Sequence, residues 1–154
     1  MTFKRMLIPA IGLILPLVML SPSTSAEEPT PTTLKGGKIV TVDEAKAVLD
    51  QKSAAFFDMR NILNYGKGHI PTAAALPYKG ESENKPDFDS SKDKLDLSKL
   101  PSGKNAKVVF YSDGPTGWKS YKAAVIAIKA GYSNVMWLRE GYAGWVAKGY
   151  GVEQ

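Results

Sequence analysis

The chain has 154 residues, a formal net charge of +5 and no cysteine. Without a thiol it cannot form a disulfide, a persulfide or a thiolate–metal bond. Its single histidine also excludes a histidine-rich metal site. We therefore expect no bound metal and no cofactor.

The first 26 residues, "MTFKRMLIPAIGLILPLVMLSPSTSA", have a basic start, an apolar run from Met6 to Leu20 and small residues up to Ala26. This order is typical of a secretory signal peptide. The alternative is a retained membrane anchor, but the run is shorter than the about 20 residues that a span needs. We predict cleavage after Ala26, a periplasmic or secreted protein, and no stable membrane anchor after cleavage.

Residues 27–154 form the predicted mature chain. Residues 1–26 contain two basic residues and no acidic one, so the mature chain has 18 basic and 15 acidic residues and a net charge of +3. This charge is too small to indicate nucleic acid as a partner. The length suits a single domain with its own hydrophobic core.

The mature chain begins with residues 27–37, whose proline, threonine and glycine content predicts a flexible leader. A short apolar strand follows at 38–40. Thr41 is placed to cap a helix, with Glu44 as its capping-box partner. The apolar segment "SAAFFDMRN" then predicts a second, buried strand.

In the middle of the chain, predicted helices and strands also follow one another. "ILNYGKGHIP" (62–71) predicts a short helix and a turn, and "TAAALPY" (72–78) a third strand. The polar segment 79–105 is long for a connection, so it is either a mobile lobe or a short helix between loops. "AKVVFYS" (106–112) is apolar at its centre, which predicts a strand in the middle of a sheet.

The last third of the chain predicts a helix over 120–131 closed by Gly131, a fifth strand over 134–140 and a final short helix over 141–151. Strands that alternate with helices predict an α/β fold. We expect an open, mostly parallel five-stranded sheet with helices on both faces.

In such sheets, ligands bind beyond the carboxyl ends of the strands. Three loops should meet there, after Phe57, Tyr111 and Leu138. The middle loop contains "GPTGWKS" (114–120), and a strand, a glycine-bracketed loop and a helix in this order commonly build an anion or nucleophile pocket. We predict a ligand-binding loop made of Ser112, Gly114, Pro115, Thr116, Gly117, Trp118, Lys119 and Ser120.

Several residues of this loop allow two interpretations. Gly114 and Gly117 either permit a tight turn or form an anion-binding nest of backbone amides. Lys119 either attracts an anion or is merely solvated. Trp118 either stacks on a ligand or packs in the core.

Three segments resemble, in the same order, parts of a rhodanese domain: "FFDMRN", "GHIPTAAALPY" and "AGYSNVMWLREGYAGWVAKGYGVE". Thr72 and Glu140 stand where this family usually has glycine. The resemblance covers nearly all of the mature chain and implies one rhodanese-like domain over residues 38–154.

The family's active loop reads Cys-x-x-Gly-x-Arg followed by Ser. "GPTGWK" aligns with it without a gap and places Gly114 at the position of the nucleophilic cysteine. Some relatives carry a longer loop, Cys-Asn-Gly-Pro-x-Cys, and against that pattern Ser112 and Gly117 replace the two cysteines. Both alignments remove the thiolate that sulfur transfer requires, so the resemblance implies a catalytically inactive homologue with no catalytic residue.

The resemblance also implies that Asp58 and Arg60 are structural residues near the site, joining strand ends to loops. His69 is expected to bond to the backbone near a helix start. Ser112 and Asp113 are adjacent in sequence, which is unfavourable for a nucleophile and its base.

We expect an exported protein without sulfurtransferase activity that binds a small anion or an unidentified protein partner. The alternative is an enzyme of the sulfurtransferase or phosphatase-like class that uses a group other than cysteine. A structural remnant with neither property is the third possibility.

Overall fold

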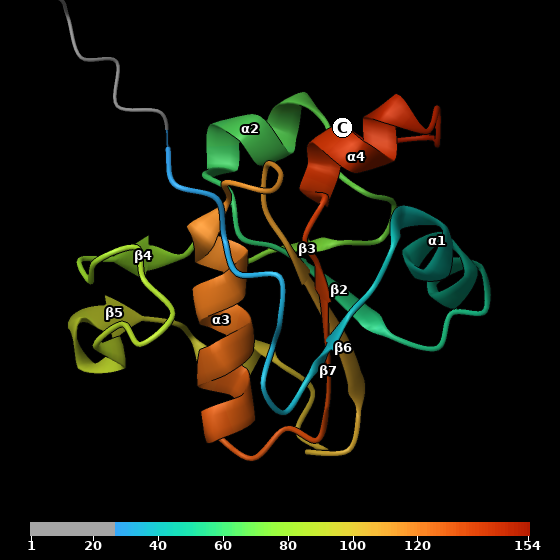
Figure 1. Ribbon diagram of the computed structural model, residues 1–154. Coiled ribbons are helices and arrows are strands. Elements are labelled where there is room, and N and C mark those ends of the chain that lie inside the picture. The colour runs from blue at the N-terminus through green and yellow to red at the C-terminus, as the bar shows by residue number, and fades with distance from the viewer. Residues whose placement is uncertain (1–26) are drawn as a thin grey trace, which may run out of the picture.

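The computed structural model describes residues 27–154, and the predicted signal segment lies outside the described residues. Five parallel strands form one sheet in the order β1-β7-β6-β2-β3 (Figure 1). Their bounds are β1 Lys38–Ile39, β2 Ala55–Asp58, β3 Ala74–Ala75, β6 Lys107–Tyr111 and β7 Asn134–Leu138. This confirms the predicted α/β sheet, and β6 is the middle strand as expected.

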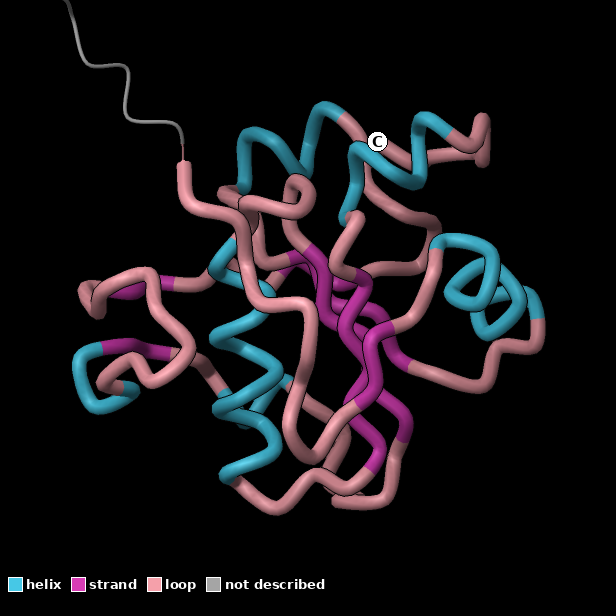
Figure 2. Tube along the Cα trace, viewed as in Figure 1, coloured by secondary structure: helices cyan, strands magenta, loops and turns pink. Residues whose placement is uncertain are grey.

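Four helices pack around the sheet: α1 (Val42–Asp50), α2 (Ile62–Lys67), α3 (Trp118–Lys129) and α4 (Gly141–Ala147). Helix α3 covers one face of the sheet, while α1 and α4 cover the other (Figures 1 and 2). None of the helices within residues 27–154 is long and apolar enough to cross a bilayer.

Local signals set the ends of the two longest helices. Thr41 and Glu44 form the predicted capping box at the start of α1. Gly131 has a φ of 96°, a conformation that favours glycine, and it lies just beyond the end of α3. Helix α3 begins at Trp118, two residues earlier than the sequence predicted.

Successive side chains of the central strand β6 point to opposite faces of the sheet. Val108 and Phe110 point toward α3, and Val109 and Tyr111 point toward α1 and α4. All four side chains are fully buried. Burying one large apolar side chain contributes about 1.5–3 kcal/mol, so a central strand buried on both faces is a major source of stability.

The third predicted strand is shorter in the structure. Only Ala74 and Ala75 pair with β2, although the sequence suggested a strand over 72–78. Thr72 has a φ of 66°, which places it in a turn, and Pro77 has no N–H to donate to a ladder. The turn and the proline therefore confine β3 to two residues at the sheet edge.

Residues 28–34, which we call the strap, differ from the flexible leader that composition suggested. Thr30 and Leu34 are buried, and Thr30 donates from its N–H (2.8 Å) and its hydroxyl (2.6 Å) to the Pro115 carbonyl. Arg139 donates to the carbonyls of Thr30 and Pro31, both at 2.9 Å. Composition reports only local flexibility, whereas these bonds come from residues far along the chain.

The segment 79–105, which we call the lobe, contains an antiparallel pair, β4 (Lys79–Gly80) and β5 (Asp93–Lys94), and two single turns of 3-10 helix, η1 (Ser90–Lys92) and η2 (Leu97–Lys99). It lies beside α3 (Figure 2). Phe88 and Leu100 anchor it in the core beneath α3. The lobe is thus an ordered hairpin with turns, which neither sequence interpretation described.

Candidate functional site

The loop between β6 and α3 (residues 112–117) lies at the carboxyl end of the sheet, where the sequence predicted the site. The first turn of α4 holds its backbone. Tyr142 N–H donates to the Ser112 carbonyl at 2.8 Å, and Ala143 N–H donates to the Asp113 carbonyl at 2.9 Å. The loops after β6 and β7 therefore meet, as expected for neighbouring parallel strands.

Gly141 makes this close approach possible. Its φ is +61°, and a Cβ there would lie 2.5 Å from the Ser112 carbonyl oxygen and 2.7 Å from the Gly114 nitrogen. Any larger residue would have to displace backbone atoms. Gly141 thus fixes the distance between α4 and the loop.

The loop is also held from within and by the strap. Gly117 N–H donates to the Gly114 carbonyl at 2.8 Å, which closes a tight turn. On the outside, Pro115 accepts both bonds from Thr30. The backbone path of the loop is therefore set by bonds from α4, the strap and the loop itself, and most of these are bonds between backbone groups.

A cavity of about 490 Å³ opens beside this loop, and we call it the site cavity. The loop, the first turns of α3 and the start of the lobe line it. Of the predicted loop residues, Ser112, Thr116, Gly117, Trp118 and Lys119 line the cavity. Gly114, Pro115 and Ser120 are not in its wall.

The two alignments of the loop predict different positions for the missing thiol, and the geometry separates these positions. Ser112 is in the cavity wall. A Cβ on Gly114 would instead approach the Glu140 carbonyl oxygen (3.6 Å) and the Ala143 methyl (3.8 Å), at the start of α4. A Cβ on Gly117 would lie 2.9 Å from the Ser112 Cβ, so positions 112 and 117 face each other.

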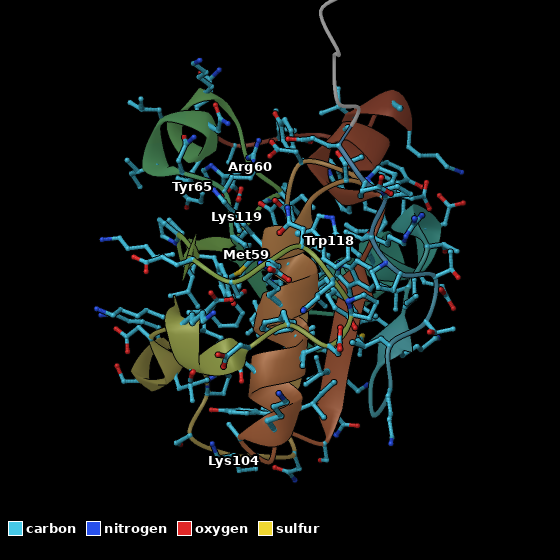
Figure 3. The ribbon with its side chains drawn as sticks, turned by 60° about the vertical axis from the view of Figure 1, so that its left-hand side comes forward. Met59, Arg60, Tyr65, Lys104, Trp118 and Lys119 are labelled. Carbon is cyan, nitrogen blue, oxygen red and sulfur yellow. The ribbon has the colours of Figure 1, made fainter. Side chains whose placement is uncertain are left out.

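Trp118 and Lys119 begin α3 and leave it on opposite sides, with Lys119 toward the lobe (Figure 3). Trp118 is buried, packs edge-on against Tyr121 at 5.7 Å and donates its indole N–H to the Glu28 carbonyl at 2.8 Å. It therefore belongs to the core and forms part of the cavity wall. Lys119 is exposed.

Ser120 has a structural position. Its hydroxyl donates to the Gly117 carbonyl at 3.0 Å and accepts from the Trp137 indole N–H at 2.9 Å. The side chain is buried and faces the sheet. It ties the start of α3 to β7 and is not available to a ligand.

Lys122 is a site residue that the sequence interpretation missed. It is 4% exposed, lines the cavity and donates its ammonium to the Ser82 carbonyl at 2.9 Å. Burial lowers the pKa of Lys122, and the nearby charge of Asp93 opposes this shift. A lysine three positions after Lys119, inside the apolar helix "YKAAVIAIK", was the available signal.

Asp58 and Arg60 form a buried ion pair at the end of β2. The Arg60 guanidinium donates to both Asp58 oxygens, with the shortest contact at 2.7 Å, and to the Gly68 carbonyl at 2.6 Å. Burial disfavours the charge on Arg60, but the bonds to Asp58 outweigh it and raise its pKa. The pair connects a strand end to the turn at Gly68 and is not in the cavity wall.

His69 is also outside the cavity wall. Its ring stacks on Tyr65 at 3.8 Å, and Nδ1 lies 3.1 Å from the Tyr65 carbonyl oxygen. Its backbone pairs with Glu153. It does bond to backbone, but beyond the end of α2 and not at a helix start.

A comparison with known families identifies this arrangement. The model of the rhodanese-like domain matches residues 41–148. The chain belongs to the rhodanese-like family. The match contains the loop, α3 and α4, so the elements that build the site cavity are those of the family's domain.

Two curated proteins are similar to this chain in sequence. The uncharacterized protein YibN of Escherichia coli K12 is 29% identical over 112 residues, covering 72% of this chain and 68% of its own. A tRNA uridine(34) hydroxylase of Erwinia tasmaniensis is 31% identical over 107 residues, but these are 68% of this chain and only 27% of that protein.

Solved structures share the fold. The BH2092 protein of Bacillus halodurans superposes with a TM-score of 0.58 at 21% identity, covering 75% of this chain and 76% of its own. A thiosulfate sulfurtransferase of Pseudomonas aeruginosa gives 0.55 at 22% identity, covering 77% of this chain and 20% of that one. At these identities the likeness establishes the fold.

Proposed function

We propose that this protein is an exported rhodanese-like protein that does not transfer sulfur and that binds a small anion or a partner through the site cavity. One observation carries the proposal. A serine hydroxyl, Ser112, lines the cavity at the carboxyl end of the central strand, in a chain with no cysteine.

The chemistry follows from the atom that is present. Sulfur transfer in this family needs a thiolate that accepts a sulfur atom and becomes a persulfide. An alcohol such as Ser112 cannot form a persulfide. We take position 112, and not 114, as the vacated nucleophile position, because a side chain at 114 would point at α4.

The cavity keeps features that suit an anion. Lys119 and Lys122 lie on its α3 side, and the first turn of α3 has no side-chain cap. Glu27 and Asp113 also line the cavity, so the formal charges balance. An anion should therefore bind weakly, on the α3 side.

Binding is tested by titrating the processed protein with sulfate or tungstate while following the backbone amides of residues 114–120 by NMR. We expect shifts in these amides that are lost in Lys122→Met and kept in Lys107→Met, an exposed lysine at the opposite end of β6. Unchanged loop amides at high anion concentration in the wild type would contradict anion binding.

The catalytic alternative is tested by turnover. The one histidine, His69, stacks on Tyr65 outside the cavity wall, and the Lys122 ammonium donates to the Ser82 carbonyl. We expect background rates with thiosulfate and cyanide and with p-nitrophenyl phosphate. Turnover that disappears in Ser112→Ala would establish an enzyme in place of a binding protein.

Export is tested separately. Mass spectrometry of the native protein should find Glu27 at the N-terminus, because signal peptidase is expected to cut after Ala26. A protein that still begins near Met1 would contradict the cleaved signal. It would not bear on anion binding in the site cavity.

A further inference from the structure

A second hollow, of about 630 Å³, lies next to the site cavity between the lobe and α3. Lys79, Lys92, Lys94 and Lys119 line it, and we call it the lysine groove. Glu81 is the acidic residue in its wall. Tyr78, Gly80 and Lys119 line both hollows, so the groove and the site cavity are direct neighbours.

These four lysines have no acidic neighbour at contact distance in the part of the chain that the structure describes. The ion pairs there use other cations, namely Lys38, Lys46, Arg60, His69, Lys85 and Lys148. Lys79, Lys92 and Lys94 are exposed, as is Lys119. The groove therefore presents four exposed lysines, three from the lobe and one from α3, with one acidic residue, Glu81, in its wall.

Two of the lysines lie where their charges destabilise the fold. Lys79 and Lys94 are directly opposite each other in the β4–β5 pair. Like charges in this position destabilise a strand pair, and a pair of two-residue strands is marginal to begin with. Both side chains line the groove at this point. An anionic ligand bound there would relieve the repulsion between them.

We propose that the lysine groove binds an acidic segment of a partner protein, with carboxylates opposite Lys79, Lys94 and Lys119. The inference rests on the proposed function and specifies its partner class. The groove wall offers no exposed aromatic ring on which a base could stack, since Tyr78 is buried and its hydroxyl is held by Asp93. It offers no exposed apolar side chain for a lipid either. Lysines beside glycine and serine suit carboxylates on an extended chain.

The test uses fluorescein-labelled hexaglutamate and the processed protein, with binding followed by fluorescence anisotropy. Lys94→Glu removes one groove charge and creates an opposite-charge pair with Lys79, so it should raise the melting temperature while raising the Kd for hexaglutamate about tenfold. The matched control is Lys107→Glu, which makes the same change in net charge far from the groove and should change Kd by less than about twofold.

The result is specific because Lys94→Glu should gain stability while it loses affinity for hexaglutamate. Equal losses in Lys94→Glu and Lys107→Glu would show attraction to net charge alone and would overturn the proposal. So would binding of hexaglutamine as tight as that of hexaglutamate, or displacement of hexaglutamate by inorganic polyphosphate at far lower concentrations. Sulfate-dependent shifts of residues 114–120 that persist in Lys94→Glu would show that the site cavity binds its anion whether or not the groove binds a peptide.

Discussion

The loop (112–117) and the lobe (79–105) form two walls of the same cavity, but they are stabilised in different ways. Backbone bonds from the first turn of α4 and from the strap hold the loop. A single carboxylate, Asp93, organises the start of the lobe. The side chain at position 112 is not among the groups that hold the loop. A change of the side chain at position 112 should therefore leave the backbone path of the loop unchanged.

Asp93 accepts four hydrogen bonds. They come from the Tyr78 hydroxyl (2.6 Å), the Ser82 hydroxyl (2.6 Å) and the backbone N–H groups of Glu81 and Ser82 (both 2.9 Å). The Ser82 carbonyl in turn accepts from Lys122. One substitution in the lobe should therefore disturb the cavity wall more than most side-chain changes in the loop.

The largest effect is expected for Gly141→Ala. The added methyl would lie within 3 Å of backbone atoms of Ser112 and Gly114, at a positive φ. Overpacking and the left-handed conformation together should cost about 3 kcal/mol of unfolding free energy. Urea denaturation measures this cost.

Gly131→Ala is the matched control, because Gly131 also has a positive φ but has no atom within 4 Å of the added methyl. The free energy of unfolding of this variant should fall by only about 1 kcal/mol. Equal losses in the two variants would show that α4 does not press against the loop.

The next largest effect is expected for Asp93→Ala. The substitution removes the acceptor of the Tyr78 and Ser82 hydroxyls and of two backbone N–H groups. This loss should lower the free energy of unfolding by about 2 kcal/mol. Hydrogen exchange at the amides of Glu81 and Ser82 should accelerate while the loop amides stay protected. Asp96→Ala, which removes an exposed turn carboxylate that Ser98 bonds to, should leave the exchange of Glu81 and Ser82 unchanged.

A smaller, pH-dependent effect has the same origin. Burial opposes the ionisation of Asp93, but the hydrogen bonds from Ser82, Tyr78 and Glu81 outweigh it and lower its pKa. The stabilisation from Asp93 is therefore complete above the unfolded pKa of about 3.9 and is lost as the pH falls through the lower folded pKa.

NMR in acid should show this loss locally. The amides of Glu81 and Ser82 should shift below about pH 4 in the wild type, and the shift should be absent in Asp93→Asn. Loop amides that move with the same midpoint would indicate that the loop and the lobe unfold as one unit.

The smallest effect on the fold is expected for single cysteine substitutions in the loop. Ser112→Cys should place a thiol in the cavity near Lys119 and Lys122, with a pKa below the free value of about 8.5. It should form a persulfide with thiosulfate, visible as one added sulfur in the intact mass. Gly114→Cys should fold, since the φ of Gly114 is not positive, but it should react more slowly because its side chain points at Ala143.

Faster persulfide formation in Gly114→Cys would favour the six-residue alignment. Position 114, and not 112, would then correspond to the family's nucleophilic cysteine. Ordinary thiol pKa values in both folded variants would mean that the charges of the cavity no longer favour a thiolate.

Features that depend on neighbouring residues along the chain could be predicted from the amino-acid sequence. Thr41 and Glu44 are three residues apart, and their capping box could be recognised from that spacing. The continuous apolar run that contains Val108, Val109 and Phe110 was enough to place the central strand. The order of strands and helices followed from these patterns.

The groups that meet at the candidate site come from distant segments and could be identified only in the folded chain. Thr30 bonds to Pro115 across 85 positions of sequence, and Lys122 bonds to Ser82 across 40. The tertiary structure also decided that Ser112 lines the cavity while Gly114 faces α4, because this depends on where α4 packs. Local propensity describes a few residues at a time, whereas burial and hydrogen bonding at the site arise only when distant segments are brought into contact.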